Sequence, residues 1–483
     1  MTDPLRHDIA VAGSATLLLA GVLAAIGYLL LRAGAGRLTA RKIPHAVCGI
    51  FAAAAAFELS SFTAIVVVLA VATLALVIVV ERHALPDVLD GTRARDYGLV
   101  GFAAGAWVSV VAFWPDRVAI AAGLVVLGLA DAGAALIGHR FGRHRVAAGG
   151  ALRSFEGSAT FVAVALAVTF AFTAIGLKLD VLTAVTVSIF VALTTASIEL
   201  LVLPAADNLL VTPWVALLVH LSRDLSSTDS LRWLIASLFG CATVLVTTRM
   251  RWLDPPGAIG GAWVAAVAIG LGGWPWIVPA ATFFVLTSVL TAYRRVESTG
   301  SLRGLRQVAA NGVVPIAAPV IGYALTHNQV WFAVYIGGVA ASIADSWASE
   351  IGRFSRRSPI SLRSRRRVPK GTSGAVSPLG LIATCVGGSA VGVVGALFSD
   401  PTMVIVGLAA GIAGSALDSL IGATVQGRFV CPACEASVED RYHCGVPGGL
   451  AAGRRWIDND VVNTLANIAG AAVAFGVFEL VSA

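Results

Sequence analysis

The sequence contains few charged residues. Asp, Glu, Lys and Arg make up 13% of its 483 residues, whereas soluble domains contain about 25%. Because 57% of the residues are hydrophobic, a soluble globular fold is excluded. Sustained alternation of apolar and polar residues is also lacking, which excludes a membrane β-barrel. We therefore predict an all-α, polytopic integral membrane protein with about sixteen transmembrane helices, at about 20 apolar residues per crossing.

The first residues lack a basic segment and a clear cleavage site. We therefore predict that the apolar run 9–31 is retained as the first helix. The net charge of +7 does not indicate a nucleic-acid partner, because the basic residues lie in short loops between apolar runs, where membrane topology accounts for them.

Loops rich in Arg and Lys alternate with loops that are almost free of them. Cytoplasmic loops of membrane proteins carry the excess of basic residues. This predicts a cell-membrane protein with both termini on the non-cytoplasmic side and the motif loops in the cytoplasm. The predicted cytoplasmic loops are 32–45, 81–97, 138–156, 204–207, 249–256, 294–307, 347–373 and 425–460.

A polar segment, 222–231, interrupts the apolar pattern. We interpret it as the joint between two membrane domains, 1–221 and 232–483, the second with a Cys-rich cytoplasmic loop at 427–457.

Acidic and basic residues gather at predicted cytoplasmic helix ends in the first half. Carboxylates bind Mg²⁺ and cations bind phosphate oxygens, so the set predicts a nucleoside triphosphate site. Asp131 and Asp207 would hold Mg²⁺, and Glu199 would be the base. The predicted phosphate ligands are Arg41, Lys42, His45, Arg153, Ser154, Glu156, Gly157, Ser158 and Asn208. Alternatively, Asp131 is a solvated helix-end residue, and the three residues Arg41, Lys42 and His45 only determine topology.

In the second half, Asp345 and Glu350 end an apolar run, and an arginine-rich loop leads to Lys370 in a glycine-rich turn. Such turns bind phosphate through backbone N–H groups. Asp418 lies inside an apolar run, where an ionisable residue suggests function. Asp345, Glu350 and Asp418 would hold Mg²⁺. The predicted phosphate ligands are Lys370, Gly371, Thr372, Ser373, Gly374, Ser377, Asn311, Asn459 and Asn463. Alternatively, Asp418 is a satisfied structural residue, and Asn459 is a helix cap beside a surface Asn463.

The two halves share a pattern. Asp131 and Asp345 are each followed seven residues later by a glycine, and Arg153 and Lys370 each stand four residues before one. The pattern predicts two related phosphate sites, one in each half.

The first-half motifs resemble the phytol kinase and dolichol kinase family, which is related to CTP-dependent phosphatidate cytidylyltransferases. The resemblance covers 38–221 and is carried by R-K-x-x-H, the run from Asp131, R-S-F-E-G-S and the later E…D-N pair. It implies a CTP-dependent kinase of a long isoprenoid alcohol. Arg153 stands where the family has lysine, and the two are not interchangeable at a phosphate.

The second-half motifs resemble the phytyl-phosphate kinase family of integral membrane proteins, known as domain of unknown function number ninety-two. The blocks A-D-S-W-A-S-E-I-G, G-T-S-G-A-V-S-P-L-G, G-S-A-L-D-S-L-I-G-A-T-V-Q and D-N-D-V-V-N carry it over 233–483. It implies phosphorylation of an isoprenyl monophosphate to the diphosphate. Ser346 replaces the family's usual threonine and keeps the hydroxyl.

Three of the six cysteines lie in one loop with a histidine. The spacing of Cys431, Cys434, His443 and Cys444 suits a small structural Zn²⁺ site. The alternative is reduced cytosolic thiols, since a disulfide is not expected on that side.

Together these features predict a two-domain membrane kinase that makes an isoprenyl monophosphate and then the diphosphate, with Mg²⁺ and CTP or another nucleoside triphosphate. A cytidylyltransferase that makes a CDP-lipid, and a lipid or solute transporter, are the alternatives. The sequence leaves the oligomeric state open.

Overall fold

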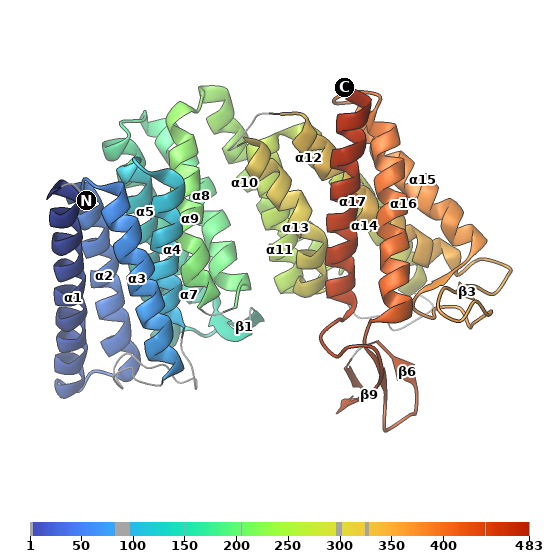
Figure 1. Cartoon of the computed structure of the whole chain (residues 1–483), viewed down its shortest axis with the longest axis horizontal. Coiled ribbons are helices and arrows are strands. Elements are labelled where there is room, and N and C mark those ends of the chain that lie inside the picture. Colours follow the sequence, from blue (N-terminus) through green and yellow to red (C-terminus); the bar gives the residue numbers. More distant parts are fainter. Residues whose placement is uncertain are drawn as a thin grey trace. The chain divides into compact units, whose positions relative to one another are not determined.

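Helices make up most of the chain (Figure 1). The structure is a computed structural model that describes residues 3–82, 97–148, 150–203, 205–295, 302–323, 328–439 and 441–482. Of the loops predicted to be cytoplasmic, 81–97 lies mostly outside these described residues, and so does the segment 296–301 of the loop 294–307.

The chain forms two compact units, Met1–Leu238 and Phe239–Ala483. The boundary falls inside the helix α10 (Ser227–Arg249). The segment 222–231, predicted as the joint, comprises the short helix η3 (Ser222–Asp224) and the beginning of α10.

The first unit consists of helices and one β-hairpin. Its elements before η3 are α1 (Asp3–Arg32), α2 (Arg37–Glu58), α3 (Phe62–Glu81), α4 (Gly98–Phe113), α5 (Arg117–Val126), η1 (Leu127–Asp131), α6 (Ala132–Phe141), β1 (Arg145–Ala148), β2 (Ala151–Ser154), α7 (Phe155–Ala171), η2 (Phe172–Gly176), α8 (Val181–Leu201) and α9 (Ala206–Leu221). The segments α5, η1 and α6 form one continuous helix in which η1 is a π-turn ending at Asp131. Such π-turns are frequent at functional sites.

The second unit contains the remaining elements. After α10 they are α11 (Pro255–Val267), η4 (Ala268–Gly272), α12 (Trp274–Arg295), α13 (Leu305–Ile321), α14 (Val330–Gly352), β3 (Ile360–Ser361), β4 (Ala375–Val376), α15 (Pro378–Ala396), α16 (Met403–Thr424), β5 (Arg428–Val430), β6 (Ser437–Val438), β7 (Tyr442–His443), β8 (Val446–Pro447), β9 (Gly449–Ala452) and α17 (Asn459–Ser482). Helices α14 to α17 pack against one another.

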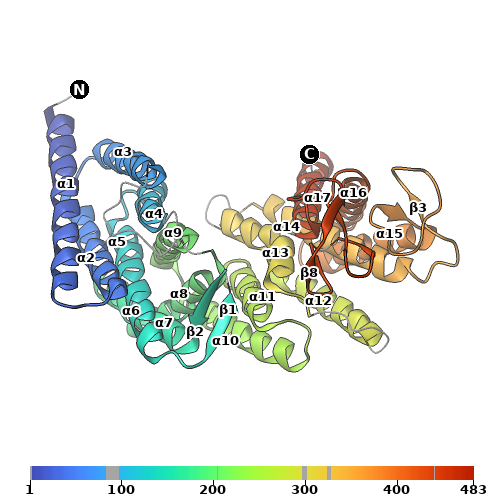
Figure 2. The ribbon, with the colours of Figure 1, turned by 90° about the horizontal axis from the view of Figure 1, so that it is seen from below.

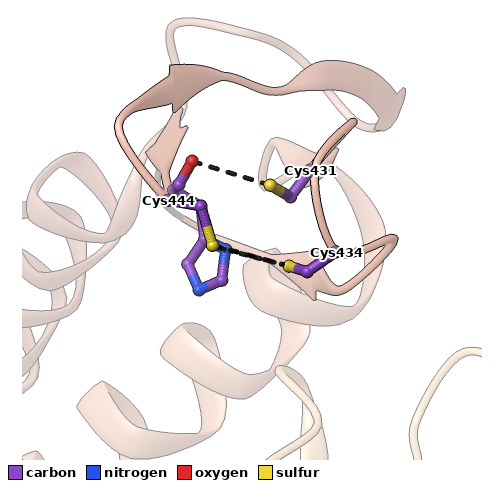
Figure 3. Close-up of side chains that lie close together, drawn as sticks. Cys431, Cys434 and Cys444 are labelled. Carbon is purple, nitrogen blue, oxygen red and sulfur yellow. Dashed lines mark hydrogen bonds between the residues drawn. The ribbon is translucent and has the colours of Figure 1, made fainter.

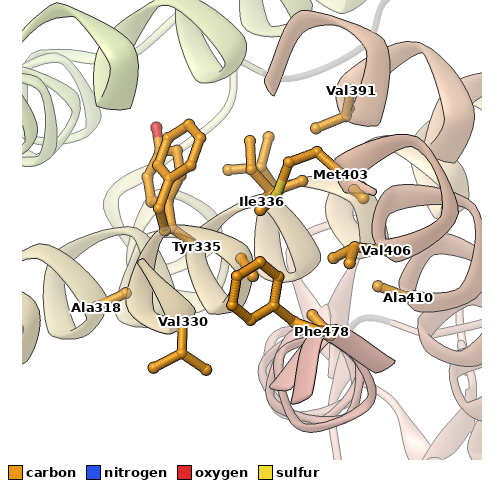
Figure 4. Close-up of a cluster of buried hydrophobic side chains, with 14 of the residues drawn as sticks. Ala318, Val330, Tyr335, Ile336, Val391, Met403, Val406, Ala410 and Phe478 are labelled. Carbon is orange, nitrogen blue, oxygen red and sulfur yellow. The ribbon is translucent and has the colours of Figure 1, made fainter. Parts of the chain in front are cut away.

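The core of the second unit lies among these four helices. Tyr335 and Ile336 of α14 lie close to Met403 and Val406 of α16 and to Phe478 of α17 (Figure 4). Burial of these apolar side chains holds α14 and α16 together, and this contact fixes the spacing of the polar residues farther along the same helices.

The Cys-rich loop folds into small β-structures. Strands β6, β5 and β9 form a three-stranded sheet, and β7 pairs with β8. Figure 1 shows β6 and β9 beyond α16 and α17, at the end of the second unit opposite the C-terminus. The sequence did not predict these strands, because each is only two to four residues long.

The prediction of an all-α integral membrane protein is confirmed. Within the described residues, 11 helices are long and apolar enough to cross a membrane, and three shorter apolar helices accompany them. Side chains such as Leu17, Leu18 and Val71 are more than half exposed, as expected of a surface that faces lipid. The predicted number of about sixteen crossings is not confirmed, and the sidedness of the loops stays a prediction.

Asp116 ties the beginning of α5 to the end of α9. Its carboxylate accepts hydrogen bonds from Ala119 N at 3.1 Å, from His220 Nδ1 at 2.8 Å and from Arg223 Nε and Nη2 at 2.5 Å. Burial opposes ionisation, but the bonds from Arg223 and His220 outweigh it and lower the pKa of Asp116 below its usual value. The ionised form is therefore the one that stabilises the fold.

We expect Asp116→Asn to lower the free energy of unfolding by about 2–3 kcal/mol at neutral pH, since it weakens charged hydrogen bonds. Because folding lowers this pKa, the stabilisation is complete above the unfolded value of about 3.9 and is lost as pH falls through the folded value. Thermal unfolding in detergent should show a constant difference between wild type and variant above about pH 5 and a shrinking one below about pH 4. A difference that grows on acidification would contradict this account.

Candidate functional site

Two carboxyl groups of the second unit meet between α14 and α16. Asp345 of α14 and Asp418 of α16 lie within hydrogen-bonding reach of each other, and the negative charge of Glu439 acts on both. The small residues Ala344 and Gly411 at the helix contact allow this approach. Two neighbouring acids inside a membrane domain do not both ionise readily without a compensating cation. The arrangement is therefore suited to binding a metal ion.

The turn from Lys370 to Gly374 lies across the ends of the same helices. Lys370 Nζ donates to the Arg353 carbonyl at 3.0 Å, just past the end of α14. At Gly374, φ is +69° and a Cβ would lie 2.2 Å from Ala423 N of α16, so only glycine allows this contact. Gly371 also has a positive φ, at +84°. The exposed lysine thus stands at the end of α14, about two helical turns beyond Asp345.

Glu350 was predicted as a third magnesium ligand beside Asp345. It follows Asp345 by five residues on α14, whereas residues on one helix face are three or four apart. Five residues correspond to about 140° around an α-helix, so the two side chains leave α14 in different directions. The role of Glu350 as a magnesium ligand stays a prediction.

The three asparagines of the second half that were predicted as phosphate ligands lie on α13 and α17. Asn311 Nδ2 donates to the Gln307 carbonyl at 2.9 Å. Asn459 begins α17, and the residue that caps this helix is Asp458, whose Oδ1 accepts from Val461 N at 3.1 Å. Asn463 is half-buried one turn farther along.

Asn467 is a polar residue that sequence reasoning missed. It is 1% exposed, donates to Asn311 Oδ1 at 3.3 Å, and accepts from Ser342 Oγ at 2.7 Å. Ser342 precedes Asp345 by one turn, so these bonds connect α13 and α17 to the helix of the carboxylate pair. The four-residue repeat of Asn459, Asn463 and Asn467 on one helix face was the available signal.

Gln426 and Glu439 were also not predicted as site residues. Gln426 follows α16, and its Oε1 accepts from Ser373 Oγ at 2.8 Å while its Nε2 donates to Glu439 Oε2 at 3.3 Å. These bonds join the Lys370–Gly374 turn to the Cys-rich loop. Glu439 gave no signal, because it lies among other polar residues of a loop.

The polar residues of the first unit form ion pairs. Lys42 of α2 pairs with Asp131 at the π-turn, and His45 Nε2 lies 3.5 Å from Asp131 Oδ2. Arg153 pairs with Glu199 of α8 and, at 3.1 Å, with Asp207 of α9. The side chains of Arg153, Glu199 and Asp207 are at most 13% exposed. In the first unit, Lys42 and Arg153 neutralise the carboxylates. At Asp345 and Asp418 of the second unit, one carboxyl group lies beside another.

These ion pairs adjoin a cavity of about 750 Å³, within the usual range of small-molecule sites. One end gathers most of the polar residues, and apolar side chains of α1 to α5 line most of the rest, together with Thr16 and Glu58. The polar residues that line it include Arg41, Lys42, His45, Asp131, Asp207 and Asn208. Glu199, predicted as the base, does not line the cavity, because it faces Arg153. A ligand with a polar head and a long apolar chain fits this shape.

The R-S-F-E-G-S turn begins α7. Ser154 Oγ caps this helix by accepting from Gly157 N at 3.1 Å. Glu156 accepts from His144 N at 3.3 Å and from its Nδ1 at 2.8 Å, which fastens the β1–β2 hairpin. Ser158 is half-buried in the first turn. The contacts of Ser154 and Glu156 are thus those of a helix cap and a hairpin anchor.

Each unit contains a helix, a β-hairpin and a second helix in this order. Strand β2 leads into α7 and β4 leads into α15, and Figure 2 shows β1 and β2 near α7 and β3 near α15. Both second helices have a serine cap: Ser154 Oγ accepts from Gly157 N, and Ser377 Oγ accepts from Gly380 N, each at 3.1 Å. The local geometry at the two helix starts is the same.

The glycines that follow the two aspartates occupy equivalent places in this geometry. A Cβ at Gly138 would lie 2.8 Å from the first capping oxygen, and one at Gly352 would lie 3.1 Å from the second. When the two halves are aligned on the capping serines, Arg153 corresponds to Val376, because each residue directly precedes its serine. The predicted pairing of Arg153 with Lys370 is therefore wrong, because Lys370 lies in the longer loop between β3 and β4.

The residues of the Cys-rich loop come together. The ligand atoms of Cys431, Cys434, His443 and Cys444 all lie within 4.8 Å of one another (Figure 3). His443 Nδ1 is 3.4 Å from both Cys434 Sγ and Cys444 Sγ. Within the described residues, this is the one group of three or more Cys, His, Asp or Glu side chains gathered this closely.

Comparison with known proteins finds relatives. Residues 238–471 match the family described as integral membrane protein DUF92. The uncharacterized membrane protein MJ0933 of Methanocaldococcus jannaschii is 30% identical over 209 residues, covering 41% of this chain and 86% of that protein. The uncharacterized membrane protein sll0875 of Synechocystis is 29% identical over 260 residues, or 51% and 91% of the two chains. Protein PGR of Arabidopsis thaliana is 27% identical over 277 residues, or 50% and 93%. No solved structure matches.

Proposed function

The chain belongs to the integral membrane protein family DUF92, and from this premise we propose that it is a membrane-bound isoprenoid kinase. Its first half phosphorylates an isoprenoid alcohol such as phytol, geranylgeraniol or a polyprenol, as its resemblance to phytol and dolichol kinases implies. Its second half phosphorylates the monophosphate to the diphosphate. The donor is a nucleoside triphosphate, CTP by preference, with Mg²⁺. The meeting of Asp345 and Asp418 near the Lys370 turn is the observation that carries this proposal.

In the second half, the acceptor phosphate is already anionic and needs no strong base. Its oxygen forms the new bond to the γ-phosphorus, the bond from that phosphorus to the bridging oxygen breaks, and the nucleoside diphosphate leaves. Asp345 and Asp418 offer the oxygen ligands that Mg²⁺ prefers, and Mg²⁺ bound there would neutralise charge on the transferred group. Lys370 and the N–H groups of its turn hold phosphate oxygens.

In the first half, Asp131 and Asp207 are the candidate magnesium ligands, and Arg41 and Lys42 are the cations for phosphate. The alcohol oxygen attacks the γ-phosphorus and must lose its proton. We assign the proton to His45, because its imidazole lines the cavity and its Nε2 lies 3.5 Å from Asp131 Oδ2. This assignment replaces Glu199, which does not line the cavity.

The apolar part of the cavity supports a long-chain acceptor. Ala72 of α3 lines the cavity, whereas Ala70 of the same helix is exposed and does not. We expect Ala72→Phe to raise the KM for geranylgeraniol about tenfold and to leave a short-chain alcohol almost unaffected, because the added ring occupies chain space. Ala70→Phe is the matched control and should behave as wild type. Equal effects of the two variants would contradict the assignment of the chain to this cavity.

Product analysis tests the proposed function. Purified protein is incubated with Mg²⁺, isoprenoid alcohols or monophosphates, and CTP labelled either in the γ-phosphate or in cytidine, with ATP and UTP in parallel. A kinase transfers the γ-label to the lipid. Label from cytidine in the lipid would instead identify a cytidylyltransferase. Unmodified lipid with all three nucleotides would favour a transporter.

A further inference from the structure

The cysteine–histidine cluster has the donor set of a zinc site. Three thiols and an imidazole converge from two turns, one after β5 and one between β7 and β8. Zn²⁺ is bound tetrahedrally by such Cys and His ligands in small structural modules. Cys444 has a φ of +53°, and Gly445 follows with +75°, so this second turn is tight enough to present adjacent residues to one point.

The first of these turns determines where Glu439 lies. Strand β6 pairs with β5, with Phe429 opposite Val438. Cys431 N also donates to the Ala436 carbonyl at 3.0 Å. Because Glu439 comes directly after Val438, a metal that fixes the Cys431–Cys434 turn also fixes the position of Glu439.

Glu439 in turn lies near the carboxylate pair of the membrane helices. Gln426 Nε2, just past α16, donates to Glu439 Oε2 at 3.3 Å. The negative charge of Glu439 acts on both Asp345 and Asp418. A loop carboxylate is thus held beside two helix carboxylates, where a divalent cation would offset all three charges.

We propose that Cys431, Cys434, His443 and Cys444 bind one Zn²⁺ and that this zinc module holds Glu439 in place as a further carboxylate for the divalent cation at Asp345 and Asp418. The inference rests on the proposed function of that pair. Glu439 is a ligand or a positioning residue for the cation, and the zinc is structural. Loss of zinc would therefore weaken binding of the divalent cation at Asp345 and Asp418, although no cysteine belongs to that site.

Two measurements on the purified full-length protein test this. Zinc content is measured by mass spectrometry, and the affinity for Mn²⁺, as a substitute for Mg²⁺, by electron paramagnetic resonance. We expect one zinc per chain in wild type and in Glu439→Gln, and a small fraction of that in Cys434→Ser. Cys434→Ser and Glu439→Gln should each weaken Mn²⁺ binding about tenfold, and the double variant should be no weaker, because both act through one carboxylate.

Glu435→Gln is the matched control, since Glu435 is exposed in the same turn, and it should change neither quantity. Chelation of zinc from folded wild type should repeat the Cys434→Ser effect without a mutation. The inference would be overturned if the protein contained no zinc or if removal of zinc left the Mn²⁺ affinity unchanged. It would also be overturned if the losses of Mn²⁺ affinity in the two single variants multiplied in the double variant. Each of these results would leave the kinase proposal standing. Mn²⁺ binding that Asp345→Asn does not affect would overturn the proposed function itself.

Discussion

Asp345→Asn should reduce formation of the isoprenyl diphosphate by about 10³-fold, because it removes a ligand of the cation that neutralises the transferred phosphoryl group. The same change should leave the folded protein equally or more stable without divalent cations. An amide next to Asp418 removes the unfavourable free energy of holding two acids close together. Active-site residues often lower the stability of a fold in this way. Lost activity together with retained stability separates a functional carboxylate from a structural one.

The assay compares diphosphate formation and thermal unfolding in matched variants. Asp400→Asn changes an exposed carboxylate in the loop between α15 and α16 and should affect neither quantity. Asp131→Asn should abolish the monophosphate product from the alcohol while the second reaction continues. If Asp345→Asn made the diphosphate at the wild-type rate, the assignment of this pair would be wrong.

Arg153→Met should destabilise the protein by about 3–5 kcal/mol, the usual cost of leaving buried charges without a partner. Arg153 is the shared cation of Glu199 and Asp207, and all three side chains are almost fully buried. Arg153→Lys should recover only part of the loss, since an ammonium cannot replace a planar guanidinium that serves two carboxylates. Thermal unfolding in detergent measures both changes.

The control for this prediction is Arg306→Met. The side chain of Arg306 is 74% exposed in its pairs with Asp458 and Asp460, so its loss should cost at most about 1 kcal/mol. Adding Glu199→Gln and Asp207→Asn to Arg153→Met should restore stability, because no buried charge is then left unpaired. A cost for Arg153→Met as small as that for Arg306→Met would show that the buried ion pairs do not stabilise the fold.

The sequence was informative where a residue's place in a helix determined its surroundings. Asp418 inside an apolar run predicted a polar site, and the structure brings it to Asp345. Glu350 is a harder case: it is close to Asp345 in sequence, but five residues correspond to about 140° around α14, so proximity in sequence does not by itself predict a shared site.

Long-range contacts account for most of what the sequence could not predict. Glu439 reaches the helix carboxylates only because β6 pairs with β5 beyond the membrane helices. The cavity of the first unit is formed by side chains from α1 to α5, each of which has an ordinary apolar pattern. The correspondence of the two serine caps was hidden by the different lengths of the hairpin loops before them.

The most direct test of this account follows the phosphorus atoms by ³¹P NMR. Purified protein is given geranylgeranyl monophosphate, Mg²⁺ and CTP, alongside Asp345→Asn and Asp418→Asn. The account predicts that wild type converts the monophosphate signal into the paired signals of a diphosphate while CDP accumulates, and that neither variant does so. A monophosphate signal that persists in wild type with every nucleoside triphosphate, or a diphosphate formed by both variants, would contradict it.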